Sequence, residues 1–162
     1  RLFRETLSHG IVIAAQSEGD AERFRSIGAN PARTHVLGNL KFDYVLPAEV
    51  PDRAARLRDE LGRGRPVWVA GSTHDGEEEI VLDAHRRLRE RHPTALLVLA
   101  PRKPQRLDDV VALLRRRGHS FVTRTSGAAV APEVEVLLVD TLGELVLFYG
   151  AGDVAFVGGS LV

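Results

Sequence analysis

The 162-residue sequence contains no cysteine and no methionine. Without cysteine the chain can form neither a disulfide framework nor a thiolate metal site, which fits a reducing compartment. No apolar run reaches the roughly 18 residues that a transmembrane helix needs. The 22 lysines and arginines are balanced by 22 aspartates and glutamates, so any anion-binding site must be local and not a property of the whole surface.

Aromatic residues are also scarce, at 6% of the sequence, and this bears on two basic segments. The stretches HRRLRERH and LLRRRGH lie on expected amphipathic helices, and neither interleaves aromatic side chains with its cations. Cations on a solvated helix face or near a helix C-terminus need no ligand to explain them. We therefore expect no nucleic-acid partner.

From Pro66 onward, short apolar runs alternate with amphipathic helical patterns. Strands are expected in VWVAGS, ALLVLA, SFVT, VEVLLVD and VAFVGG, and helices near residues 76–91, 105–117 and 142–149. This alternation predicts an α/β fold whose parallel sheet is covered by helices on both faces. The preceding residues 46–65 combine prolines, a short amphipathic helix and a glycine-rich exit, which is typical of a linker.

Polar or glycine-rich loops follow three of the expected strands: GSTHDGEEE, APRKPQR and VDTLGEL. Because ligands bind outside the carboxyl ends of parallel strands, these loops predict a ligand site at one edge of the sheet. In the first loop, the hydroxyls of Ser72 and Thr73 and the free backbone amides could hold a phosphate, whereas Glu77–Glu79 are explained by the positive end of a helix alone. His74 has no cysteine or helically spaced histidine nearby, so no zinc site is expected.

The second loop offers the sharpest candidate for anion binding. Arg102 follows the strand directly, where its guanidinium can contact a phosphate or carboxylate through two parallel N–H groups. Pro101 fixes the backbone before it. Lys103 and Arg106 are more simply explained as the solvated start of the next helix.

In the third loop, Asp140 or Thr141 is expected at a helix N-cap, with Gly143 and Glu144 in the first turn. A side chain at position 143 would block a ligand approaching the helix terminus, so glycine there favours a binding site. The paired glycines of FVGGSL would allow a similar approach.

Together, the motifs GNLKFD, GSTHDGEEE, PRKPQR and DTLGELVLFYGAGDVAFVGGSLV resemble those of the Kdo (3-deoxy-D-manno-octulosonic acid) transferases of Gram-negative lipopolysaccharide biosynthesis. The resemblance covers essentially the whole chain. It implies a GT-B glycosyltransferase with two Rossmann-like halves, which transfers Kdo from CMP-Kdo to a lipid A precursor at the cytoplasmic face of the cell inner membrane. It implies no cofactor, and the sequence has no DxD-type carboxylate pair that would require a metal.

The same resemblance implies a domain organisation. Residues 1–45 would be the tail of the N-terminal acceptor domain, 46–65 a linker with a short helix, and 66–162 most of the donor nucleotide-binding domain, incomplete at its C-terminus. The rest of the acceptor half, with its membrane-associating segment and glutamate base, would precede Arg1. The chain opens in mid-pattern without an initiating methionine, so we expect an internal piece that is inactive alone.

Site residues are carried over only where this sequence matches the family's motifs. Lys41, in the Lys-Phe-Asp motif, would stabilise the transition state. The residues that would contact CMP are Pro101, Arg102, Leu142, Gly143 and Glu144. Nothing is carried over to Lys103 and Gln105, which stand where the family has histidine and glutamate. Two alternatives are a nucleotide-sugar epimerase-like half, which would prefer uridine, and a non-catalytic nucleotide-binding module that serves assembly.

Overall fold

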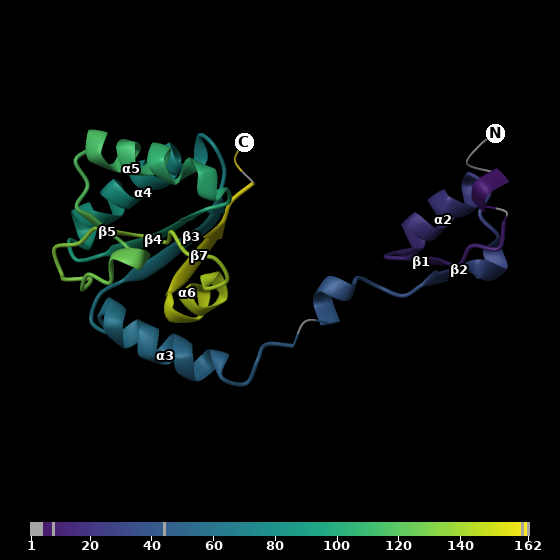
Figure 1. Ribbon diagram of the computed structural model, residues 1–162, viewed down its shortest axis with the longest axis horizontal. Coiled ribbons are helices and arrows are strands. Elements are labelled where there is room, and N and C mark those ends of the chain that lie inside the picture. Colours follow the sequence, from purple (N-terminus) through teal and green to yellow (C-terminus); the bar gives the residue numbers. More distant parts are fainter. Residues whose placement is uncertain (1–4, 8, 44, 160, 162) are drawn as a thin grey trace. The chain divides into compact units, whose positions relative to one another are not determined.

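The computed structural model describes residues 5–7, 9–43, 45–159 and 161 (Figure 1). The chain forms two compact units, Arg1–Leu46 and Pro47–Val162, called here the first and second units. In the first unit, the strands β1 (Ile13–Ala15) and β2 (Thr34–Val36) pair in parallel. The helix α2 (Glu18–Ser26) connects them, and Ser17 caps it by accepting a hydrogen bond from the Asp20 N–H at 3.2 Å. The 3₁₀ turns η1 (Pro31–Arg33) and η2 (Leu40–Asp43) precede and follow β2.

The second unit is built on a five-stranded sheet with the order β5-β6-β4-β3-β7, and every neighbouring pair is parallel. Its strands are β3 (Val67–Thr73), β4 (Leu96–Pro101), β5 (Phe121–Thr123), β6 (Val136–Leu138) and β7 (Val154–Val157). Its helices are α3 (Val50–Leu61), α4 (Glu77–Arg91), α5 (Leu107–Arg116) and α6 (Leu145–Ala151), with 3₁₀ turns η3 (Pro104–Arg106) and η4 (Arg124–Ser126). The predicted α/β fold with a Rossmann-like parallel sheet is confirmed.

Helices cover both faces of this sheet, α4 and α5 on one side and α3 and α6 on the other (Figure 1). Successive side chains of a strand point to opposite faces, so a strand buried on both sides is apolar throughout. In β4, Leu97 and Leu99 pack in the cluster that holds residues of α4 and α5, whereas Leu96 and Val98 pack in the cluster of α3 and α6. This explains why LLVLA is an unbroken hydrocarbon run.

Helix α3 packs within the second unit, although the sequence places it in a linker. Its buried side chains are Val50, Ala54, Leu57 and Leu61. A Cβ on Gly150 of α6 would lie 2.8 Å from the Ala54 Cβ, so the two helices approach closely at a glycine. The chain therefore divides between residues 46 and 47, and α3 belongs to the second unit. In the described part of the chain, no helix is long and apolar enough to cross a membrane.

Candidate functional site

The carboxyl ends of β3, β4, β6 and β7 meet at one edge of the sheet, because these neighbouring strands are all parallel. From β3 the chain reaches β4 through α4 on one face, and it later reaches β7, on the other side of β3, through α6 on the opposite face. Helices that leave in opposite directions open a crevice at such a switch point, and ligands bind there in this class of fold. The predicted site at the sheet edge is therefore built around the end of β3.

The loops after β3 and β4 are joined at this edge. Pro101, the last residue of β4, pairs with Thr73, and the Arg102 N–H donates to the Thr73 carbonyl oxygen at 2.9 Å. Beyond this bond the Arg102 side chain is exposed. A cavity of about 380 Å³ lies elsewhere, and the one at this edge measures about 330 Å³. Its lining residues are Thr73, His74, Asp75, Arg102, Lys103 and Arg106.

Arg106 is part of the protein's own packing, which differs from the solvated helix start that the sequence favours. Its Nη1 lies 2.8 Å from Oε1 of Glu78, a residue only 1% exposed, and its Nη2 lies 2.8 Å from Oδ1 of Asp75. The Thr73 hydroxyl donates to the same Glu78 oxygen at 2.9 Å. Burial lowers the pKa of Arg106, but the hydrogen bond and charge of Glu78 outweigh burial and raise that pKa. The Arg106 cation is thus already neutralised.

Glu77 connects the loops after β3 and β7 through hydrogen bonds. Its carboxylate is fully buried and accepts hydrogen bonds from the N–H groups of His74, Gly159 and Leu161 at 2.8 to 3.1 Å. A Cβ on the neighbouring Gly158 would lie 2.3 Å from a backbone oxygen, so glycine is required by close approach there. The sequence assigned these acids only to the helix terminus, and it missed that two of them are buried and organise the loops.

The loop after β6 departs from the predicted capping arrangement. Helix α6 begins at Leu145, and the residue before it, Glu144, makes no side-chain cap. Asp140 instead accepts a hydrogen bond from the Thr125 N–H at 2.8 Å, in the loop after β5. Gly143 has a φ of +82°, and a Cβ there would meet no atom within 4 Å. The positive φ therefore explains why residue 143 is a glycine, whereas crowding by other protein atoms does not.

Leu142 and Glu144 have contrasting environments. The Leu142 side chain is 83% exposed, so it is available to a ligand. The Glu144 carboxylate is bound by the Thr141 hydroxyl and by Arg124, whose Nη2 lies 3.2 Å from Oε1. The Thr141 hydrogen bond, with the Arg124 charge, holds the pKa of Glu144 below its usual range. Glu144 is therefore a fixed anion at this edge.

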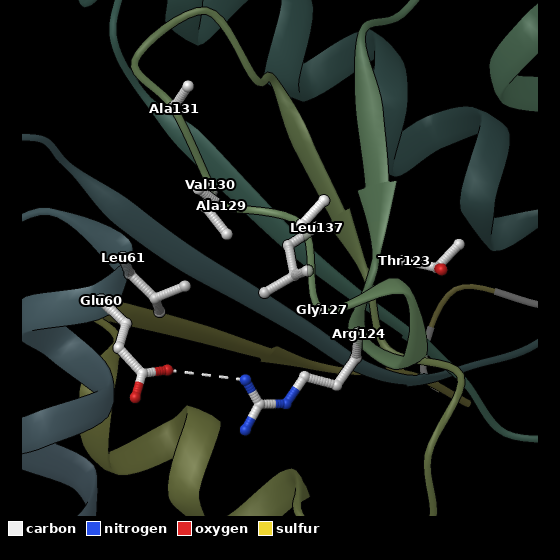
Figure 2. A pocket seen from close by; sticks show the side chains of 10 residues that line it. Glu60, Leu61, Thr123, Arg124, Gly127, Ala129, Val130, Ala131 and Leu137 are labelled. Atoms are coloured by element: carbon white, nitrogen blue, oxygen red, sulfur yellow. Dashed lines mark ion pairs between the residues drawn. The ribbon is translucent and has the colours of Figure 1, made fainter.

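Arg124 is a residue that sequence reasoning missed. It also lies 3.5 Å from Glu60 of α3 and stacks over the Phe148 ring, with 5.8 Å from its guanidinium carbon to the ring centroid. Figure 2 shows it beside the larger cavity, between the Glu60 carboxylate and the loop after β5. The available signal was its position, because Arg124 directly follows a strand, as Arg102 does.

Lys41 belongs to the first unit, whereas Pro101, Arg102, Leu142, Gly143 and Glu144 belong to the second. Lys41 lies in η2 with an exposed side chain, and its backbone N–H donates to Oδ1 of Asn39 at 3.0 Å. The structure therefore brings the five predicted nucleotide contacts to the ends of the adjacent strands β4 and β6. Their roles, and that of Lys41, stay predictions. Among the described residues no group of histidines and acids is placed to hold a metal ion.

The sequence of this chain is similar to those of known proteins. Residues 1–44 match the family model described as 3-deoxy-D-manno-octulosonic-acid transferase (kdotransferase). The chain is 39% identical to the 3-deoxy-D-manno-octulosonic acid transferase of Haemophilus influenzae over 93% of its own length and 35% of the relative. It is 40% identical to the enzyme of the same name from Bordetella pertussis, over 98% of its own length and 37% of the relative.

A solved structure adds a match in three dimensions. The crystal structure of the C-terminal CMP-Kdo binding domain of WaaA from Acinetobacter baumannii aligns with a TM-score of 0.66 at 30% identity, covering 72% of this chain and 61% of that one. The chain spans only 35% and 37% of the lengths of its two curated relatives. Motifs, fold and relatives agree that the chain is similar to part of the 3-deoxy-D-manno-octulosonic acid transferases.

Proposed function

We propose that this chain is part of a glycosyltransferase that moves Kdo from CMP-Kdo to a lipid A precursor in lipopolysaccharide biosynthesis, with the second unit holding the CMP-Kdo. The observation that carries the proposal is the similarity of this chain to a CMP-Kdo binding domain, together with the cationic cavity at its sheet edge. A nucleotide-sugar epimerase or a non-catalytic module would also use such an edge. The transferase is favoured because the curated relatives that match this chain carry transferase names.

The chemistry follows from the charges at the edge. In transfer, an acceptor hydroxyl attacks the anomeric carbon of Kdo, the bond from that carbon to the phosphate oxygen breaks, and CMP leaves. Negative charge grows on the phosphate as the bond breaks, so a fixed cation that contacts it stabilises the transition state more than the bound donor. Arg102 would make this contact, and its exposure at the end of β4 and its backbone hydrogen bond to Thr73 support that role.

Lys41 would be a second residue that stabilises the transition state. Its ammonium is exposed at a turn and is therefore available to a reacting group. We further propose that the whole enzyme acts at the cytoplasmic face of the cell inner membrane, because its acceptor, a lipid A precursor, is a membrane lipid.

The test is transfer by the full-length protein with CMP-Kdo and a lipid A precursor, followed by CMP release and by the mass of the lipid product. We expect CMP to inhibit at least about tenfold more strongly than UMP, since a site that hydrogen-bonds one base leaves polar groups unpaired with the other. Equal inhibition by UMP with epimerised sugar as product would support the epimerase. CMP binding without any transfer would support the non-catalytic module.

A further inference from the structure

The donor of the proposed reaction carries two anions close together, and this constrains its site. Kdo is an ulosonic acid, so its anomeric carbon bears the carboxylate carbon directly and, in CMP-Kdo, also the oxygen that links to phosphate. Two negative charges on neighbouring groups disfavour each other unless cations lie nearby. A site that binds the phosphate must therefore also accommodate a carboxylate a few ångströms away.

The cavity between the ends of β3 and β4 holds three cationic side chains, and their states differ. Arg106 is neutralised by Glu78 and Asp75, each at 2.8 Å. Arg102 and Lys103 line the same cavity with exposed side chains, and within the described residues neither has an ion-pair partner. Two cations without an ion-pair partner among the described residues thus face one cavity, and the donor brings two anions.

The backbone that carries these two cations is fixed. The Arg102 N–H is bound to Thr73, and the Thr73 hydroxyl is bound to the buried Glu78. Lys103 precedes Pro104, which restricts it to extended backbone, and its φ and ψ are −112° and 117°. Only the long side chains must be ordered when a ligand binds, so the cost of ordering is small compared with that of a mobile loop.

We propose that Lys103 binds the carboxylate of the Kdo group while Arg102 binds the adjacent phosphate, which makes Lys103 a determinant of specificity for an acidic sugar. The inference rests on the proposed function, since it assigns the second anion of CMP-Kdo. Arginine suits the phosphate because it offers two parallel N–H groups, and lysine suits the carboxylate as a compact point charge. The assignment also gives a function to a residue that the sequence alone explains as solvated.

The experiment separates the two anions by using a probe that lacks one of them. In the full-length enzyme, the KM for CMP-Kdo and the inhibition constant of CMP are measured for Lys103→Gln, Lys103→Arg and Arg102→Gln. Lys103→Gln should raise the KM for CMP-Kdo about tenfold and leave CMP inhibition within about twofold, because CMP has no carboxylate. Lys103→Arg should restore most of the loss. Arg102→Gln should weaken both ligands.

Arg87→Gln is the matched control, since it removes one exposed cation from α4, outside the cavity. Equal weakening of CMP and CMP-Kdo by Lys103→Gln would overturn the inference, because Lys103 would then serve the phosphate. The inference would also be overturned if Lys103→Gln left both the KM for CMP-Kdo and the inhibition constant of CMP unchanged, or if it changed only the KM for the lipid acceptor. If the unmodified enzyme neither used CMP-Kdo nor was inhibited by CMP, the proposed function itself would be wrong. Measurements on the unmodified enzyme therefore distinguish that failure from a failure of the Lys103 assignment.

Discussion

Replacing Arg106 with methionine should destabilise the second unit and leave donor binding largely intact. The substitution keeps an unbranched side chain but removes the cation that faces Glu78 at 2.8 Å. Glu78 is 1% exposed, so water cannot replace the lost partner. Among the described residues, its carboxylate would retain the hydrogen bond from the Thr73 hydroxyl alone. A buried charge left in this state is unfavourable, which makes Arg106 a stabilising residue and not a ligand-binding one.

The size of the effect follows from the burial of the pair. Removing one partner of a buried ion pair costs about 3–5 kcal/mol of unfolding free energy. The Arg106 side chain is 20% exposed, so water already screens part of the attraction, and we expect the lower end of that range. A loss of about 3 kcal/mol in a domain of this size lowers Tm by roughly 10 °C.

Thermal unfolding followed by circular dichroism or calorimetry measures this shift. The double variant Glu78→Gln/Arg106→Met should melt above Arg106→Met alone, because it leaves no buried charge. Asp75→Asn is the control, since Asp75 is 92% exposed and should change stability by less than about 1 kcal/mol. If Arg106→Met melted within about 2 °C of the unmodified protein and lost CMP affinity instead, Arg106 would be a ligand-binding cation.

Four further outcomes are expected. In the full-length enzyme, Arg102→Lys should lower kcat/KM for CMP-Kdo almost as much as Arg102→Ala without lowering Tm, since an ammonium cannot make two parallel N–H contacts; normal turnover by Arg102→Ala would contradict this. Lys41→Ala should lower kcat with little change in donor affinity, and a loss confined to KM would instead indicate a binding residue. Gly158→Ala should cost about 1–3 kcal/mol in denaturant unfolding, because its Cβ would lie 2.3 Å from a backbone oxygen, whereas Gly64→Ala, with open space around it, should be nearly neutral. Burial lowers the pKa of His85 from 6.5 to about 4, so below pH 6.5 the unfolded state binds a proton that the folded state does not bind. The free energy of unfolding should therefore fall by about 2 kcal/mol by pH 5. His85→Gln, which can keep both hydrogen bonds, should reduce this pH dependence.

The sequence by itself determined the class of fold and the edge that carries the site. Short unbroken apolar runs such as residues 96–100, which alternate with longer helical patterns, predict strands covered on both faces, and the helices between them predict a parallel sheet. All parallel strands end at the same edge, so Arg102 and the loop after residue 139 were expected at one edge of the sheet, and the strand order then shows that they follow neighbouring strands. The order of residues along the chain was sufficient for these two predictions, because each depends only on the local sequence pattern and on the direction of the strands.

Only the tertiary structure decided which polar side chains are partners. Arg106 and Glu78 are 28 residues apart, and their pairing requires β3 and β4 to be neighbours in one register. Arg124 meets Glu144 because β5 and β6 are adjacent and α6 begins beside them. No local pattern encodes such distances. For the same reason the sequence treated Arg106 as solvated, although the fold pairs that cation with a buried carboxylate and leaves Arg102 and Lys103 exposed at the cavity.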